Sequence, residues 1–150
     1  MKTGNEIWRS DVNPEPPWSM YQGNPVYYEG AFYTATYDGH LNKFDMATGK
    51  LLWSANTGDS KGETQQDGWP IERGPYFSNG VAYVSHRLKT PNQPRRRGQQ
   101  LLAFDIKTGD MLWNISGVHK VAGIADGYLV TVNYYENMMT IYGKGPSKTT

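Results

Sequence analysis

Short runs of apolar residues recur along the chain, and successive runs are separated by a two-residue turn signal. The turn signals are Glu29–Gly30, Asn79–Gly80 and Asp126–Gly127. Asn-Gly and Asp-Gly between β-rich runs are strong short-range signals for a β-hairpin, because both turn residues tolerate positive φ. The pattern therefore predicts three hairpins and an all-β chain.

A longer motif follows the first two hairpins, and it repeats. Residues 41–58, LNKFDMATGKLLWSANTG, recur as residues 101–117, LLAFDIKTGDMLWNISG, and the second half of the motif appears in residues 2–9, KTGNEIWR. The shared aspartate can accept hydrogen bonds from nearby backbone N–H groups, and the shared glycine can adopt positive φ, so the motif predicts strand, tight turn and strand. Its residues are Asp45, Thr48, Gly49 and Trp53 in one copy, Asp105, Thr108, Gly109 and Trp113 in the other, and Trp8 in the partial copy.

A hairpin and the motif after it make a four-stranded antiparallel meander of about 45 residues, which is typical of a propeller blade. The last blade has three strands, and one blade carries a polar insertion that we expect to be a loop. The expected segments are residues 1–9 (outermost strand of a split blade), 25–55 (a blade), 74–116 (a blade, with the insertion at 87–98), 118–142 (three strands of a last blade) and 143–150 (tail or linker).

The Asp-x-x-Thr-Gly-x-x-x-Trp pattern resembles the tryptophan-docking motif of quinoprotein-like, or PQQ-like, β-propellers, and the resemblance covers nearly the whole chain. Residues 141–147 are similar to the end of the last blade in secreted archaeal and bacterial members. The resemblance implies that Trp53 and Trp113 each pack against the neighbouring blade. Truncating either to alanine is then expected to cost about 3–5 kcal/mol.

The predicted strands amount to about three blades, whereas typical propellers have roughly four to eight. Residues 1–9 could complete the last blade within the chain. Three blades left open would instead expose two apolar inter-blade faces. We therefore expect a partial ring within a larger propeller, or a ring completed by copies of the chain, with two copies giving six blades.

Composition excludes several classes of function. A net charge of +1 over 150 residues predicts no strong field, so nucleic acid is not an expected partner, and no apolar run is long enough for a membrane span. With no cysteine there can be no disulfide or thiolate metal site. The chain starts inside a motif and without a signal segment, which favours a mature or internal piece of a longer secreted protein. The resemblance implies an extracellular or cell-envelope location.

The long connections at residues 10–24, 56–73 and 87–98 are all expected on one face of the propeller, and the tight turns on the other. Binding residues concentrate on long loops held by a rigid scaffold, so we expect any partner at this elaborated face. The arginine cluster there could hold a carboxylate, a phosphate or an acidic glycan. Alternatively, these loops only cover the blades or lie in solvent. The candidate residues are Trp18, Tyr21, Trp69, Arg73, Arg95, Arg96 and Arg97.

Titratable residues form no recognisable metal or catalytic pattern. The three histidines lack metal-ligand spacing, and three acids in one loop lack the alternating ligands of a calcium loop. These residues are His40, His86, His119, Asp59, Glu63 and Asp67. We expect His40 to be exposed, since it follows an Asp-Gly turn. Asp45 and Asp105 hold the same place in the repeat, which favours turn caps over a catalytic pair.

The enzymes of the resembled family bind PQQ in a larger ring and often use adjacent cysteines, a Ca²⁺ ion and a catalytic aspartate. No stretch of this chain matches that site. We therefore expect a non-catalytic propeller segment without cofactor, which binds protein (further blades or copies of itself) or a surface glycan as a scaffold. The alternatives are a fragment of a PQQ-dependent quinoprotein dehydrogenase whose active site lies outside this chain, and a truncated or engineered unit that self-assembles.

Overall fold

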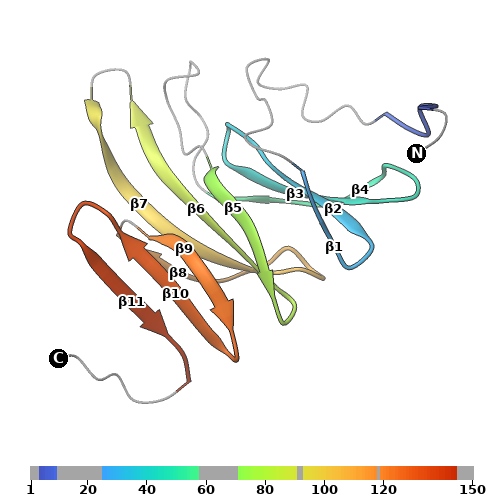
Figure 1. The fold of residues 1–150 in the computed structure, drawn as a ribbon. Helices are drawn as coiled ribbons and strands as arrows, with labels where there is room; N and C mark the ends of the chain where they lie inside the picture. Colours follow the sequence, from blue (N-terminus) through green and yellow to red (C-terminus); the bar gives the residue numbers. More distant parts are fainter. Residues whose placement is uncertain (1–3, 10–24, 58–70, 91–92, 118, 145–150) are drawn as a thin grey trace.

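The computed structural model describes residues 4–9, 25–57, 71–90, 93–117 and 119–144, with the backbone alone for residues 72–73, 88–90 and 93–98. Within these ranges the chain forms eleven strands in three antiparallel sheets of four, four and three strands (Figure 1). The predicted all-β fold of propeller blades is confirmed, and the described part is a partial propeller.

Each sheet is a meander in which strands adjacent in sequence are adjacent in space. We call the sheets the first, second and third blade. The first blade contains β1 (Val26–Tyr28), β2 (Ala31–Ala35), β3 (His40–Asp45) and β4 (Leu51–Asn56); the second contains β5 (Ile71–Ser78), β6 (Val81–Thr90), β7 (Gln93–Asp105) and β8 (Met111–Ser116); the third contains β9 (Lys120–Ala125), β10 (Tyr128–Asn133) and β11 (Met138–Tyr142).

The first hairpin of every blade turns at the dipeptide that the sequence indicates. Glu29, Asn79 and Asp126 have φ of 45°, 49° and 50°, and the glycine after each also has positive φ. Two successive residues with positive φ match the right-handed twist of the flanking strands. Because the three hairpins turn in the same way, the blades share one strand register.

This common register makes positions in different blades directly comparable. Tyr33 pairs with Lys43 across β2 and β3, and Tyr83 pairs with Ala103 across β6 and β7. Val130 pairs with Ile141 across β10 and β11. Counting from the hairpin gives the same alignment, so Tyr33, Tyr83 and Val130 are equivalent positions.

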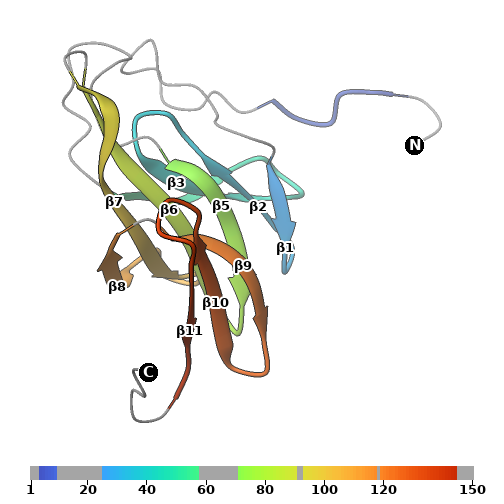
Figure 2. The same ribbon diagram turned by 60° about the vertical axis from the view of Figure 1, so that its left-hand side comes forward.

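The core lies between blades rather than inside any one of them. One cluster joins Tyr33 and Leu41 of the first blade to Val84 and Phe104 of the second, and all four are almost completely buried. A smaller cluster centres on Leu101, Val121 and Leu129, between the second and third blades. Strand β5 lies against both β2 and β9, so the second blade is held between its neighbours (Figure 2). We call the side of a blade toward the next blade in sequence its trailing face, and the opposite side its leading face.

One expectation about secondary structure is wrong. Residues 87–90 and 93–98 are not a loop, because they belong to β6 and β7, where Leu88 pairs with Arg97 and Thr90 with Gln93. Residues 4–9 pair with no sheet among the described residues, so the expectation that residues 1–9 form the outermost strand of a split blade stays a prediction. The second blade therefore carries an extended hairpin.

Candidate functional site

The contact between the first and second blades is built by Trp53. Its indole Nε1 donates a hydrogen bond of 3.1 Å to the backbone carbonyl of Ile106, in the turn of the next blade. Lys43 Nζ donates to the same carbonyl at 2.7 Å. The indole ring lies so close to Gly109 that a Cβ there would come within 2.9 Å of it. The glycine is thus required both by its φ of 81° and by the approach of the ring.

Trp8 meets the first blade in the same way. Its Nε1 donates to the carbonyl of Met46 at 2.8 Å, and a Cβ on Gly49 would come within 2.6 Å of the indole. Its ring also meets Phe32 edge-on, at 6.5 Å between centroids. Residues 4–9 therefore lie where the last strand of a preceding blade would dock, although they pair with no strand.

Trp113 is docked less completely. It is 37% exposed and packs on Tyr83 of its own blade, at 5.8 Å between ring centroids. Together with Leu129 and Tyr142 of the third blade it borders a hollow of about 270 Å³. The equivalent turn of the third blade starts at Gly143 and runs beyond the described residues, so the inter-blade role of Trp113 stays a prediction.

The two motif aspartates cap their own turns. Asp45 Oδ1 accepts hydrogen bonds from the backbone N–H of Ala47 and Thr48, and from the Thr48 hydroxyl at 2.7 Å. Asp105 Oδ1 accepts from Lys107 and Thr108 in the same manner. The hydrogen bonds from the Thr48 side chain and backbone lower the pKa of Asp45, because they favour its ionised form. All of these contacts lie within one turn, so the carboxylates have a structural role.

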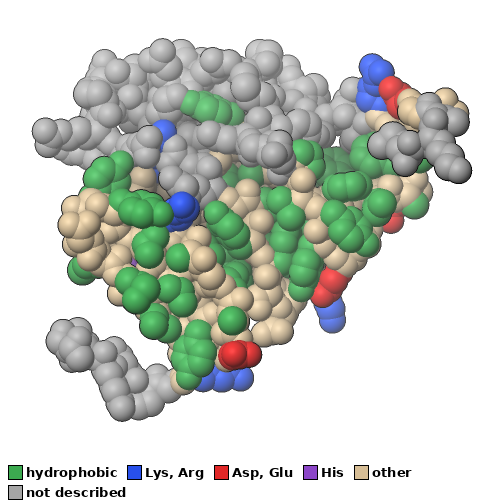
Figure 3. Space-filling model, viewed as in Figure 1, with side chains coloured by type: hydrophobic (Ala, Val, Ile, Leu, Met, Phe, Trp, Pro, Cys, Tyr) green, Lys and Arg blue, Asp and Glu red, His purple; other side chains and the backbone are tan. Residues whose placement is uncertain are grey.

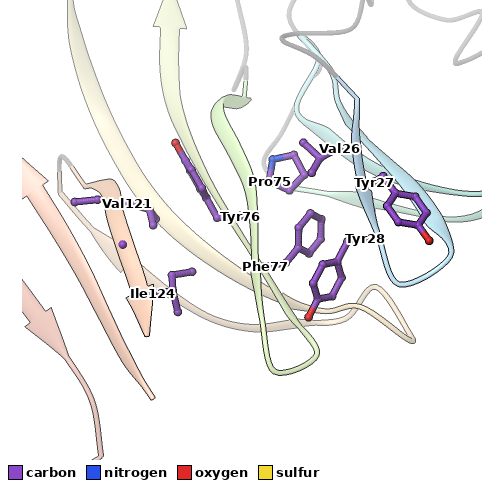
Figure 4. Close-up of a pocket in the computed structure, with 10 residues that line it drawn as sticks. Val26, Tyr27, Tyr28, Pro75, Tyr76, Phe77, Val121 and Ile124 are labelled. Atoms are coloured by element: carbon purple, nitrogen blue, oxygen red, sulfur yellow. The ribbon is translucent and has the colours of Figure 1, made fainter. Parts of the chain in front are cut away.

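A groove of about 400 Å³ runs across the first strands of the three blades (Figure 4). Tyr28 and Phe77 stack along one part of it, at 4.5 Å between centroids and 6° between ring planes. The described residues that line it are apolar and aromatic, and none of them carries a charged side chain. The residues are Val26, Tyr27, Tyr28, Pro75, Tyr76, Phe77, Val121, Ala122, Gly123 and Ile124.

The trailing face of the third blade is the largest departure from the repeat. Met139 is 66% exposed and Ile141 58%, whereas their equivalents Leu101 and Ala103 in the second blade are fully buried. Apolar side chains gather over this blade in the space-filling view (Figure 3). The face also contains a hollow of about 550 Å³ bordered by Val130 and Ile141. It is thus an inter-blade face with no blade against it among the described residues.

The predicted elaborated face is only partly placed. Trp18, Tyr21 and Trp69 lie outside the described residues. The backbone of Arg73 belongs to β5 and that of Arg95–Arg97 to β7, and their side chains are not described. The arginine cluster is therefore part of a strand and not of a loop tip, which corrects the sequence interpretation.

The histidines are more enclosed than expected. His40 is not fully exposed, because its Nδ1 lies 3.0 Å from Oδ2 of the buried Asp38. His86 of β6 is buried with Nε2 3.3 Å from Gln100 Oε1, and desolvation lowers its pKa to about 4. His119 Nδ1 lies 3.2 Å from the Thr131 hydroxyl. No group of three or more acidic or histidine side chains in the described part of the chain is placed to hold a metal ion.

The sequence analysis expected exposed inter-blade faces, but it named no residues of the trailing face of the third blade. Its signal was present in the alternation of Tyr128, Val130 and Val132, which have the period of a half-buried strand. That alternation does not say whether a neighbouring blade covers the face.

The described residues also include no helix with the length and apolarity needed to cross a bilayer.

Several dehydrogenases are similar to this chain. Over 60 residues it is 37% identical to the polyvinylalcohol dehydrogenase of Sphingopyxis sp. (strain 113P3), covering 37% of this chain and 9% of that protein. Over 114 residues it is 28% identical to the dehydrogenase subunit of the alcohol dehydrogenase (quinone) of Gluconobacter oxydans (strain 621H), covering 75% and 14%. The chain thus spans only a small part of the length of these relatives.

A solved structure of similar fold is the quinohemoprotein alcohol dehydrogenase from Comamonas testosteroni, with a TM-score of 0.56 and 25% identity over 77% of this chain and 17% of that one. The sequence profile described as "Outer membrane protein assembly factor BamB" matches residues 1–139, nearly the whole chain. Together with the three blades and the docking of Trp53, this match shows that the chain belongs to the PQQ-like β-propeller repeat family that carries this description.

Proposed function

We propose that this chain is a non-catalytic propeller segment of the cell envelope that acts as a scaffold for protein–protein interaction. The observation that carries the proposal is the trailing face of the third blade. Met139 and Ile141 are exposed there, at positions that form the buried core between other blades. A contiguous apolar face of this kind marks a surface that another protein covers.

The family description supports the location and the role. It names an outer-membrane protein assembly factor, and a role in protein assembly at a membrane fits a scaffold of the cell envelope. The chemistry of the face favours a protein over a surface glycan, because Tyr128, Met139 and Ile141 offer apolar area and few hydrogen-bonding groups.

A second candidate function is a segment of a quinone-dependent dehydrogenase, which the likeness to the Gluconobacter oxydans subunit favours. The described residues do not fit an anionic quinone such as PQQ. The described lining of the groove across the first strands offers Tyr28, Phe77 and Ile124 but no cation or carboxamide to pair with the carboxylates of PQQ. Titration with PQQ and Ca²⁺, followed by absorbance, tests this candidate: saturable binding supports it, and unchanged spectra count against it.

Site-specific photo-crosslinking tests the scaffold role. A photoreactive amino acid replaces Met139 on the exposed face. In a matched control it replaces Lys107, an exposed residue of the turn between β7 and β8. In intact cells that produce the chain, we expect protein adducts from position 139 and none from position 107. If neither position gives adducts, the face does not bind protein and the proposal is wrong.

A further inference from the structure

The interface between the first two blades contains a specific knob. Phe77, on the leading face of the second blade, stacks on Tyr28 at 4.5 Å and packs against Tyr33 at 4.6 Å between centroids. Tyr28 and Tyr33 belong to the trailing face of the first blade. An aromatic ring from one blade therefore fills the space between two side chains of the preceding blade.

The third blade has the matching hole without its knob. By register, Ala125 takes the place of Tyr28 and Val130 the place of Tyr33. Both replacements are smaller, and the hollow of about 550 Å³ is found between them, bordered also by Tyr128 and Ile141. The hole has room for a large aromatic side chain.

The knob without a hole is on the opposite side of the molecule. Tyr27 is the register equivalent of Phe77, since it pairs with Phe32 as Phe77 pairs with Ala82. It lies on the leading face of the first blade and is 56% exposed. Tyr27 therefore has the position and the size of the side chain that would fill the hollow of the third blade.

A second pair of unmatched elements accompanies the first. Residues 4–9 carry Trp8 docked as a last-strand tryptophan docks, yet they pair with no strand. Strand β11 pairs with β10 only, so its outer edge is free among the described residues. An unpaired edge is a template for one more strand.

These elements cannot meet within one molecule, because residues 4–9 and β1 lie at the end of the structure opposite to β11 (Figures 1 and 2). We propose that the third blade binds the first blade of a second copy of this chain, with Tyr27 in the hollow and residues 4–9 along β11. This rests on the proposed function, that the exposed face binds protein. Applied at both ends, the contact closes two copies into a ring of six blades, within the usual range of roughly four to eight.

Sedimentation velocity of the 150-residue chain tests the proposal. We expect a dimer of twice the 16.9 kDa chain mass at micromolar concentration. Tyr27→Ala removes the knob, and Ala125→Arg fills the hole at an exposed position. Buried aromatic anchors carry much of the binding energy of such interfaces. Each change removes or blocks one, so it is expected to weaken dimerisation at least about tenfold. The matched control is Tyr135→Ala in the β10–β11 turn, 69% exposed, which leaves the dimer unchanged.

Mixing the two variants distinguishes this contact from a symmetrical one. A pair made of one Tyr27→Ala chain and one Ala125→Arg chain retains one intact knob-and-hole contact. We therefore expect the mixture to dimerise more strongly than either variant alone. A face that bound its own copy would give no such recovery.

The possible outcomes distinguish failure of this inference from failure of the proposed scaffold function on which it rests. A folded chain that stays monomeric, or a dimer that Tyr27→Ala and Ala125→Arg both leave intact, overturns the inference. If that monomer still gives adducts with another protein from position 139, the scaffold role stands and only the partner is wrong. Circular dichroism of each variant confirms that loss of the dimer is not loss of the fold.

Discussion

The trailing faces of the first and third blades have the same strand register and opposite environments. In the first blade, Tyr33 and Leu41 are fully buried against the second blade. In the third, Val130 is half-buried and Met139, the equivalent of Leu41, is 66% exposed. The difference shows that burial at these positions comes from the next blade and not from the strand itself.

The third blade nevertheless keeps apolar residues at the exposed positions. A strand face in contact with water is normally polar, because exposed apolar area promotes association. Met139 and Ile141 therefore indicate an interface rather than a solvated surface. The exposure follows from the lack of a neighbouring blade among the described residues, and not from the local sequence.

Truncation of Tyr33 should give the largest effect. Tyr33→Ala removes a buried ring that Trp53 and Phe77 contact, and it is expected to lower the free energy of unfolding by about 3–5 kcal/mol. Val130→Ala, at the equivalent position, should cost less than about 1.5 kcal/mol in dilute solution. Urea unfolding of both variants measures the difference. Equal losses would show that the two faces are equally packed.

Acid should destabilise the fold through the buried His86. Burial lowers the pKa of His86 to about 4 in the folded state, below its ordinary value of 6.5. The unfolded chain then binds the proton more readily, so stability is full above pH 6.5 and falls as the pH drops toward 4. The loss approaches about 3 kcal/mol. In His86→Gln, the free energy of unfolding measured by urea titration should depend less on pH between 6.5 and 4. An unchanged pH dependence would show that another group causes the loss of stability.

Alanine substitutions at two glycines distinguish the cost of backbone strain from the cost of displacing a nearby indole ring. Gly109 and Gly127 have φ of 81° and 79°, but only Gly109 has a tryptophan ring where a Cβ would be. Alanine at either position should cost about 1–2 kcal/mol for the left-handed conformation. Gly109→Ala should cost at least about 1 kcal/mol more, because Trp53 must move. Thermal or urea unfolding of the two variants checks this, and identical losses would mean that Trp53 is not docked there.

The sequence predicted the parts of the fold that depend on local chemistry. The spacing of Asp45, Thr48 and Gly49 specifies its turn through hydrogen bonds within four residues, and those bonds are present. The hairpin dipeptides were equally informative, because positive φ at Asn79 and Gly80 is a property of the dipeptide itself.

Features that depend on distant partners were not predictable in the same way. The polar, proline-containing residues 87–98 were interpreted as a loop, but pairing of Leu88 with Arg97 extends the hairpin through them. Residues 4–9 have the composition of a last strand, yet strand formation needs an edge that this molecule does not place beside them. His40 was expected to be exposed to solvent because it follows an Asp-Gly turn, but its Nδ1 lies 3.0 Å from Oδ2 of the buried Asp38.

The comparison between the two trailing faces is tested most directly by chemical labelling. The chain has no cysteine, so Leu41→Cys and Met139→Cys each introduce a single thiol at equivalent register positions. In dilute native solution, a maleimide should modify the thiol at position 139 at least about a hundredfold faster than the one at position 41, because only the latter needs the blades to separate. In denaturant the two rates should converge. Labelling at position 41 as fast as at position 139 in the native protein would contradict the account, since it would show that the second blade does not cover the first.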